Sequence, residues 1–184
     1  VGNRIWADFD RDGIQDADEP GIGGVDVQLK TAAGVLIGTT VTAPDGTYYF
    51  FTDNVPDGDP TNPGIQVGLQ PGTVYKICVP ASEFNNGQPL NNFLVTGTDI
   101  NGVGLGDQSD NDGALQPGGF VQIMFTTGDR GENNHSLDFG FIVTDYGDLP
   151  NTYGTTEAAS GAWHWIRTDL KLGICVDAEI DGQP

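Results

Sequence analysis

Turn-forming residues divide this sequence into short apolar segments. Its 184 residues include 28 glycines and 11 prolines, many of them in Asp-Gly, Pro-Gly and Asn-Gly steps. Steps of this kind mark turns, and short apolar runs between frequent turns are typical of strands. No stretch has the length and periodicity of an amphipathic helix. The sequence therefore predicts an all-β fold.

Alternation of apolar and polar residues marks the candidate strands. Residues 25–30 alternate strictly, which predicts a strand with one buried face. Leu137, Phe139 and Phe141 likewise share one face of a later segment. The other candidate strands are residues 3–6, 35–41, 47–52, 74–79, 92–95 and 120–125. A set of about seven short strands joined by turns predicts a β-sandwich.

The sequence changes character after about residue 143. All the candidate strands above lie within residues 1–143. Two stretches in this range, 53–68 and 99–119, are rich in Gly and Asp, and we expect them to be surface loops. Residues 144–184 hold two of the three tryptophans but are too few to bury a core alone. We expect a sandwich domain over residues 1–143 and a strand-rich C-terminal extension over residues 144–184.

The chain is strongly acidic, with 7 Lys+Arg against 26 Asp+Glu and a formal net charge of −19. Self-repulsion of this size opposes the compact state unless bound cations neutralise it. The same imbalance argues against nucleic acid and membrane as partners, since both attract Lys and Arg. No run of 18 apolar residues is present to span a membrane. Val1 opens directly on a strand-like segment, so we expect that any export signal has been removed.

Residues 8–19 form the most specific motif in the chain. They read D-F-D-R-D-G-I-Q-D-A-D-E, with acids at positions 1, 3, 5, 9 and 12 and glycine at position 6. This is the full pattern of a twelve-residue calcium loop. The alternative, a solvated acidic loop, leaves six acids to repel one another beside the single Arg11. The expected calcium ligands are Asp8, Asp10, Asp12, the Ile14 carbonyl oxygen and Glu19, with Asp16 binding directly or through a water.

Strands rather than helices flank this motif. A strand-like segment precedes it, and Pro20-Gly21 leads into another. Without two helices to swing apart, a bound ion locks structure rather than transmitting a signal. Calcium is preferred over magnesium or zinc, because the donors are many carboxylates with no Cys or His nearby.

A second oxygen-rich cluster lies further along the chain. Asp107, Asp110 and Asp112 fall within six residues and are followed by Gly113. We expect a second calcium site there, although a plain turn built on Asx side chains is the alternative. The short Asp-Gly-Asp run at residues 57–59 is better explained as a solvated loop.

Two cysteines, Cys78 and Cys175, lie far apart in alternating apolar segments. In an oxidising compartment they can pair within one chain or between neighbouring chains. The alternative is two separate buried thiols. The sequence leaves these three arrangements open.

Residues for catalysis are sparse. The two histidines, His135 and His164, have no nucleophile pattern beside them, and the chain has no Gly-x-Ser-x-Gly, zinc-type or phosphate-binding motif. Paired carboxylates for glycoside hydrolysis are easy to find among 26 acids, and only their separation in space decides that case. We therefore expect a protein that is not an enzyme.

Several segments together resemble a known family. They are residues 2–6 (GNRIW), 8–19, 20–25 (PGIGGV), 45–48 (DGTY) and 71–75 (PGTVY). This set resembles the B-type repeats of bacterial serine-aspartate-repeat surface adhesins, the SdrD B-like domains, which are relatives of the collagen-adhesin (Cna) B domain. The cluster of Asp107, Asp110 and Asp112 and residues 137–141 (LDFGF) are similar to that family's later calcium loop and last strand.

The resemblance implies a fold and a function. It implies an Ig-like or transthyretin-like sandwich that binds calcium and serves as a rigid spacer on an exported protein at the bacterial cell surface. Some relatives carry an internal Lys-Asn isopeptide bond with the lysine on the first strand, but that strand offers Arg4 here, so we predict no such bond. The alternative function is an adhesive module that binds a host protein or glycan through residues 53–68 or exposed aromatic side chains.

The C-terminal extension, residues 144–184, resembles the opening of a second adhesin domain of the GEVED type. A strand-rich segment that carries Trp163 and Trp165 has to cover that apolar surface. It either folds onto its own domain or adds a strand to the next subunit. Head-to-tail addition generates a fibre, and a bond between Cys175 and Cys78 of neighbouring subunits is one way to lock it.

Overall fold

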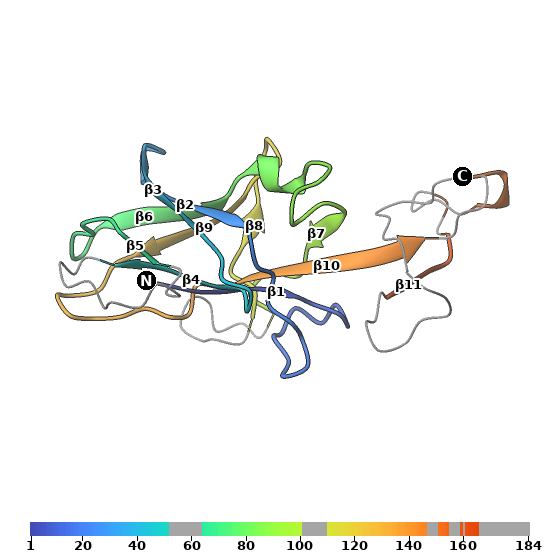
Figure 1. Cartoon of the computed structure of the whole chain (residues 1–184), viewed down its shortest axis with the longest axis horizontal. Helices are drawn as coiled ribbons and strands as arrows, with labels where there is room; N and C mark the ends of the chain where they lie inside the picture. The colour runs from blue at the N-terminus through green and yellow to red at the C-terminus, as the bar shows by residue number, and fades with distance from the viewer. Residues whose placement is uncertain (52–63, 101–109, 147–150, 155–158, 160, 166–184) are drawn as a thin grey trace.

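The computed structural model describes residues 1–51, 64–100, 110–146, 151–154, 159 and 161–165. Within these residues the chain forms eleven strands in two sheets, with two short 3₁₀ helices, η1 (Ala81–Phe84) and η2 (Asn151–Tyr153), and no α-helix. The two sheets lie face to face (Figure 1). The prediction of an all-β sandwich is confirmed.

The first sheet brings together the two ends of the sandwich sequence. Its strands are β1 (Gly2–Ala7), β4 (Thr47–Phe51), β5 (Gly64–Gln66), β7 (Phe93–Val95), β10 (Phe139–Tyr146) and β11 (Trp163–Trp165). Their order is β11-β10-β1-β4-β5, and β7 also pairs with β10. The β1–β10 pair is parallel, with Ile5 opposite Phe139 and Ala7 opposite Phe141. The first and last strands of the sandwich therefore lie side by side, which holds the end of β1 in place.

The second sheet is antiparallel throughout. Its strands are β2 (Asp26–Thr31), β3 (Leu36–Val41), β6 (Val74–Val79), β8 (Ala114–Leu115) and β9 (Val121–Thr126), in the order β3-β2-β6-β9-β8. Leu29, Ile77 and Ile123 alternate with polar neighbours and are buried. The period-two patterns of the sequence therefore correspond to real strands with one face in the core.

The core fills the space between the sheets. Leu137, Phe139 and Phe141 are fully buried there, as the shared face predicted. Tyr48 of β4 is also fully buried and donates its hydroxyl to the Leu137 carbonyl at 2.6 Å, which satisfies its polar atom inside the core. The structure has more strands than the predicted seven or so, because β5, β8 and β11 have only two or three residues each and carry too little pattern to detect.

Strand β10 extends beyond the sandwich. Its first residues pair with β1, Phe141 to Val143 pair with β7, and Thr144 to Tyr146 pair with β11. Figure 1 shows β10 leaving the two packed sheets with β11 beside its far end. The strand thus runs through the predicted boundary between residues 143 and 144, and the division into two domains stays a prediction.

Candidate metal centre

The acidic loop starts where β1 ends. Asp8 follows Ala7 directly, and its backbone N–H donates to the Phe141 carbonyl of β10 at 2.8 Å. Pairing with β10 therefore continues one residue past the strand and carries the Asp8 side chain inward, where it is 1% exposed. The loop closes at its base, since the Ala7 N–H donates to the Pro20 carbonyl at 2.9 Å.

Both carboxylate oxygens of Asp8 accept hydrogen bonds. Oδ1 accepts from the Arg11 N–H at 2.6 Å, and Oδ2 accepts from the Gly13 N–H at 3.0 Å and from the Thr96 hydroxyl. Arg11 and Gly13 have φ angles of 64° and 80°, the left-handed region that glycine adopts without strain. The glycine at position 6 of the motif thus lets the chain turn back on Asp8.

Glu19 closes the other end of the loop. Its Oε1 accepts from the Phe9 N–H at 2.7 Å and its Oε2 from the Asp16 N–H at 3.0 Å, and the side chain is 4% exposed. Burial, together with the charges of Asp8 and Asp10, raises the pKa of Glu19 to about 7. The site therefore holds negative charge that lacks solvation, which a cation relieves.

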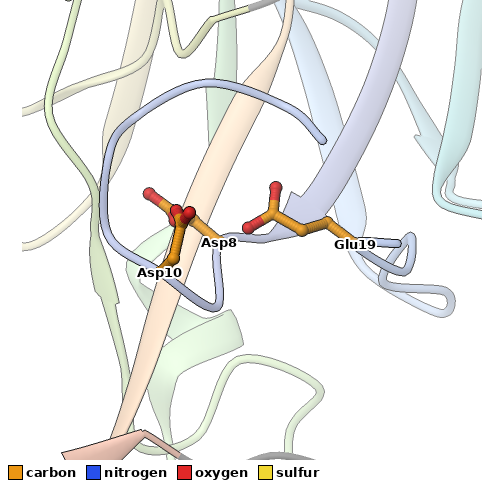
Figure 2. Close-up of side chains that lie close together, drawn as sticks. All are labelled: Asp8, Asp10 and Glu19. Atoms are coloured by element: carbon orange, nitrogen blue, oxygen red, sulfur yellow. The ribbon is translucent and has the colours of Figure 1, made fainter. Parts of the chain in front are cut away.

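The predicted ligands fall into two overlapping groups. The carboxylate oxygens of Asp8, Asp10 and Glu19 lie within 4.8 Å of one another, and so do those of Asp10, Asp12 and Asp16. Figure 2 shows the first group, with the three side chains turned toward one another from the two ends of the loop. Desolvation and the charges of Asp12 and Asp10 raise the pKa of Asp16. Asp10 belongs to both groups and links them.

Ile14, the expected carbonyl ligand, lies beside the second acidic cluster. It forms an isolated antiparallel bridge with Asp110, and the Gly13 carbonyl accepts from the Asn111 N–H at 3.3 Å. The described groups in this loop offer oxygen donors only, with no Cys or His among them. Such a donor set fits calcium better than zinc.

The second cluster is buried rather than exposed. Asp110, Asn111 and Asp112 all lie in the interior, and Asp112 is 7% exposed. Its Oδ2 accepts from the Asp138 N–H at 2.8 Å, while its buried Oδ1 accepts no hydrogen bond within the described part of the chain. Burial, followed by the charges of Asp138 and Asp110, raises the pKa of Asp112 to about 8. Asp107 lies outside the described residues, so this predicted site stays a prediction.

Asp138 is a site residue that the sequence analysis missed. It sits between Leu137 and Phe139, where alternation places it on the outer face, yet it is 1% exposed. Its oxygens accept from the Asn3 side chain at 2.9 Å and from the Arg4 N–H at 3.0 Å. The only signal in the sequence is an acid between two core residues, which the alternation pattern treats as a solvated position.

Arg4 of β1 holds the C-terminal end of the acidic loop through hydrogen bonds. Its guanidinium donates to the Asp45 carbonyl at 2.9 Å and to the Glu19 carbonyl at 3.2 Å. These bonds tie the last residue of the loop to the turn before β4. The arginine on the first strand therefore has a structural role in holding the loop.

The other residues singled out in the sequence are placed as follows. Cys78 is a buried thiol on β6 whose pKa is raised by burial, and Cys175 lies outside the described residues, so their pairing stays a prediction. His135 is exposed and packs edge-to-face against Tyr49, with 5.4 Å between the two ring centroids. His164 lies in β11 opposite Asp145.

In the part of the chain described here, no helix has the length and apolar character needed to cross a membrane.

The two-sheet fold and the acid-lined loop after its first strand define the class: a β-sandwich module with a candidate cation site. The model of the SdrD B-like domain matches residues 1–141, and the chain belongs to this family. The family is one of surface-adhesin modules and not a class of enzymes. Its model does not reach the rest of the chain, so the GEVED resemblance stays a proposal.

Curated relatives match a shorter segment. Bone sialoprotein-binding protein of Staphylococcus aureus strain MRSA252 is 52% identical over 50 residues, which are 27% of this chain and 4% of that protein. Serine-aspartate repeat-containing protein E of S. aureus strain MSSA476 matches with the same identity and the same coverage. The matched part of the chain thus spans 4% of the length of these relatives and is similar to one small portion of each.

Proposed function

We propose that this chain is a calcium-stabilised structural module of an extracellular bacterial surface protein, acting as a rigid spacer. The observation that carries the proposal is the convergence of Asp8, Asp10 and Glu19, whose carboxylate oxygens lie within 4.8 Å of one another. Two of these side chains are buried. Membership in the SdrD B-like family supports the same function.

Electrostatics explains why such a loop needs an ion. Two like charges 4 Å apart repel by about 4 kcal/mol at the effective dielectric constant near a protein surface. A calcium ion accepts six to eight oxygens and turns this repulsion into attraction. Because Asp8 continues β1 and Glu19 is tied to Arg4, the ion fastens the loop to the first sheet.

We extend the proposal to the second cluster and to the fold type. Asp110 and Asp112, with Asp107, form a second calcium site, and the sandwich is of the Ig-like or transthyretin-like type. The raised pKa of Asp112 and its buried Oδ1 support a cation there, because both reflect a carboxylate without full solvation. Calcium at both places makes the module stiff along its length.

The C-terminal extension, residues 144–184, joins neighbouring units in this proposal. It is the start of a GEVED-type segment that adds head to tail to the next subunit or module, so that spacers line up as a fibre. The projection of β10 and β11 from the sandwich supports this arrangement (Figure 1). Electron microscopy of the purified chain tests it, and dispersed single particles at high concentration contradict it.

The second candidate function is adhesion to a host protein or glycan. Of the expected binding loop, residues 53–68, residues 53–63 lie outside the described part of the chain and Gly64–Gln66 form β5. A groove of about 930 Å³ supports this function, lined by residues 126–136 together with Phe51 and residues 69–71. Arg130 and His135 give this groove polar groups suited to a sugar or a peptide. A glycan array and a pull-down with R130A/H135A beside the unchanged chain separate the two functions, since a spacer shows no ligand that depends on these residues.

Thermal unfolding with and without calcium tests the primary proposal. A site with a dissociation constant of about 10 µM in 1 mM calcium adds about 2.7 kcal/mol. For a domain of this size we expect chelation to lower the Tm by about 5 to 10 °C, and magnesium at the same concentration to restore only part of it. An unchanged Tm after chelation contradicts the proposal.

A further inference from the structure

Near the acidic residues, both the nitrogen and the oxygen of the Asn111 side-chain amide form hydrogen bonds. Asn111 is 0% exposed. Its amide nitrogen lies within hydrogen-bond distance of the carbonyls of Gly113, Thr96 and Gly97, at 3.0, 3.2 and 3.3 Å. Its Oδ1 accepts from the N–H groups of Gly113 at 2.9 Å and Gly140 at 3.0 Å. An asparagine is suited to this position because one planar group both donates and accepts.

On one side these bonds reach the first acidic loop. The Asn111 backbone N–H donates to the Gly13 carbonyl at 3.3 Å, and Asp110 pairs with Ile14. Thr96, whose carbonyl accepts from Asn111, donates its hydroxyl to Oδ2 of Asp8. Asn111 is therefore connected to Asp8, the buried candidate ligand of the first loop, through the single residue Thr96.

On the other side the bonds reach the second acidic cluster. Gly140, which donates to Asn111, lies two residues after Asp138. The Asp138 N–H donates to Oδ2 of Asp112 at 2.8 Å, and the Asp112 N–H donates to the Asp138 carbonyl at 3.0 Å. Asp112 is the residue after Asn111. Asn111 is thus hydrogen-bonded to residues that contact the acids of both regions.

We propose that Thr96 and Asn111 are positioning residues that couple cation binding in residues 8–19 to cation binding at Asp110 and Asp112. The coupling rests on the calcium function proposed above. A cation that fixes Asp8 also fixes the Thr96 hydroxyl, and through Asn111 it fixes the backbone that presents Asp112. The second ion then meets an ordered site and binds more tightly, and by linkage the effect is reciprocal.

Calcium titration followed by amide NMR tests the coupling site by site. The Gly13 resonance reports the first loop, and the Gly113 resonance reports the second cluster. Asp10→Asn removes one carboxylate of the first loop without touching Thr96 or Asn111. In the otherwise unchanged chain we expect this substitution to weaken the calcium affinity at Gly113 by about fivefold or more.

Thr96→Val removes the hydroxyl and keeps the shape of the side chain. In this background we expect Asp10→Asn to change the affinity at Gly113 by less than about twofold, because the side-chain route from Asp8 through the Thr96 hydroxyl is lost and only the weaker backbone contact at Gly13 remains. Thr96→Ser keeps the hydroxyl and retains the full effect. Thr47→Val is the matched control: it removes a threonine hydroxyl bonded to the Asp45 carboxylate at 2.7 Å, outside this network, and leaves the coupling unchanged.

Two results overturn the proposal. The first is that Asp10→Asn weakens the calcium affinity at Gly113 equally in the chain with Thr96 and in the Thr96→Val chain. The second is that Asp10→Asn leaves the calcium affinity at Gly113 unchanged in the chain with Thr96. If Thr96→Val does not fold, Thr96→Ala makes the same comparison without a buried methyl facing the carboxylate. Failure of the calcium function itself looks different, since neither glycine then responds to calcium in the unchanged chain.

Discussion

The two acidic regions of this sandwich, both proposed cation sites, are assembled in different ways. Residues 8–19 are contiguous, and most of their acids, including Asp10, Asp12 and Asp16, are exposed. The second region draws Asp110 and Asp112 together with Asp138 from another part of the chain, and all three are buried. Spacing along the chain builds the first region, and the sheet builds the second.

This difference has an energetic consequence. In the exposed loop, water screens the charges and the backbone N–H groups of the loop itself bond the carboxylates. In the buried cluster, few groups replace the lost water, and the pKa of Asp112 rises to about 8. We therefore expect the first region to tolerate single substitutions at its exposed acids and the second to tolerate few.

Asp8→Ala breaks the contrast most strongly, because Asp8 belongs to the exposed loop by sequence but is itself buried. The change leaves the N–H groups of Arg11 and Gly13 and the Thr96 hydroxyl without their acceptor. Unsatisfied buried groups cost about 1–3 kcal/mol each, so we expect a loss of about 3 kcal/mol in urea unfolding even without calcium.

Asp10→Ala is the matched control for that measurement. Its Oδ1 accepts one exposed bond, from the Asp12 N–H at 3.2 Å. We expect it to change the calcium-free stability by less than about 0.5 kcal/mol and to reduce only the gain on adding calcium. Equal losses for the two variants in calcium-free urea are incompatible with a structural role of Asp8.

Gly140→Ala alters the packing between the two regions, where Gly140 donates to Asn111 and lies against Thr96. A Cβ there comes within 2.6 Å of Thr96 Cγ2 and 2.7 Å of Trp6 Cζ2. Overpacking of this kind costs about 1–3 kcal/mol, and we expect weaker calcium binding in both regions by calorimetry. Gly34→Ala is the comparison: a Cβ there meets nothing within 4 Å, and the strain of its φ of 87° falls in the turn between β2 and β3, away from both regions. A Gly140→Ala chain with unchanged calcium affinity in both regions removes the structural link between them.

The sequence predicted those parts of the molecule whose signal is local. Strict alternation in residues 25–30 and the shared face of Leu137, Phe139 and Phe141 place these segments in the core, and the structure confirms both. The position of glycine within the acidic motif likewise predicted the turn at Gly13, where φ is 80°. Period and turn chemistry act over a few residues and are therefore visible in one sequence.

Contacts between distant segments escaped the sequence analysis. Thr96, Asn111 and Asp138 lie near the candidate ligands only because β1 and β10 pair in parallel and β7 joins β10. Nothing in the residues around Thr96 or Asn111 distinguishes them from ordinary polar loop positions. Pairing of the first and last strands is a property of the whole sheet, and no short window of sequence encodes it.

The raised pKa values of one buried carboxylate in each region make the stability of the calcium-free protein depend on pH. The pKa of Glu19 is raised to about 7 and that of Asp112 to about 8, both above their unfolded values of 4.5 and 3.8. The folded chain therefore binds more protons than the unfolded chain between pH of about 4 and 8, and stability falls as pH rises through this range.

Melts of resin-stripped protein at several pH values measure this dependence. We expect the Tm to fall from mildly acidic to mildly alkaline pH, and Asp112→Asn to flatten the upper part of the curve more than Glu19→Gln. Calcium binds the ionised carboxylates, so its addition removes or reverses the slope. A calcium-free Tm that rises over the same range contradicts the raised pKa values.

Asp18→Asn is expected to have the smallest effect and defines the edge of the first region. Asp18 is the one acid of residues 8–19 that lies at none of the motif positions, and it is exposed and outside both groups of converging oxygens. Its charge still adds to the repulsion within the loop, since it raises the pKa of Asp16. We expect a change in Tm below about 1 °C and a calcium affinity within about twofold of the unchanged chain, because a surface charge contributes only tenths of a kcal/mol. A tenfold loss of calcium affinity in Asp18→Asn, measured by calorimetry beside Asp10→Asn, means that charge density rather than ligand position holds the ion.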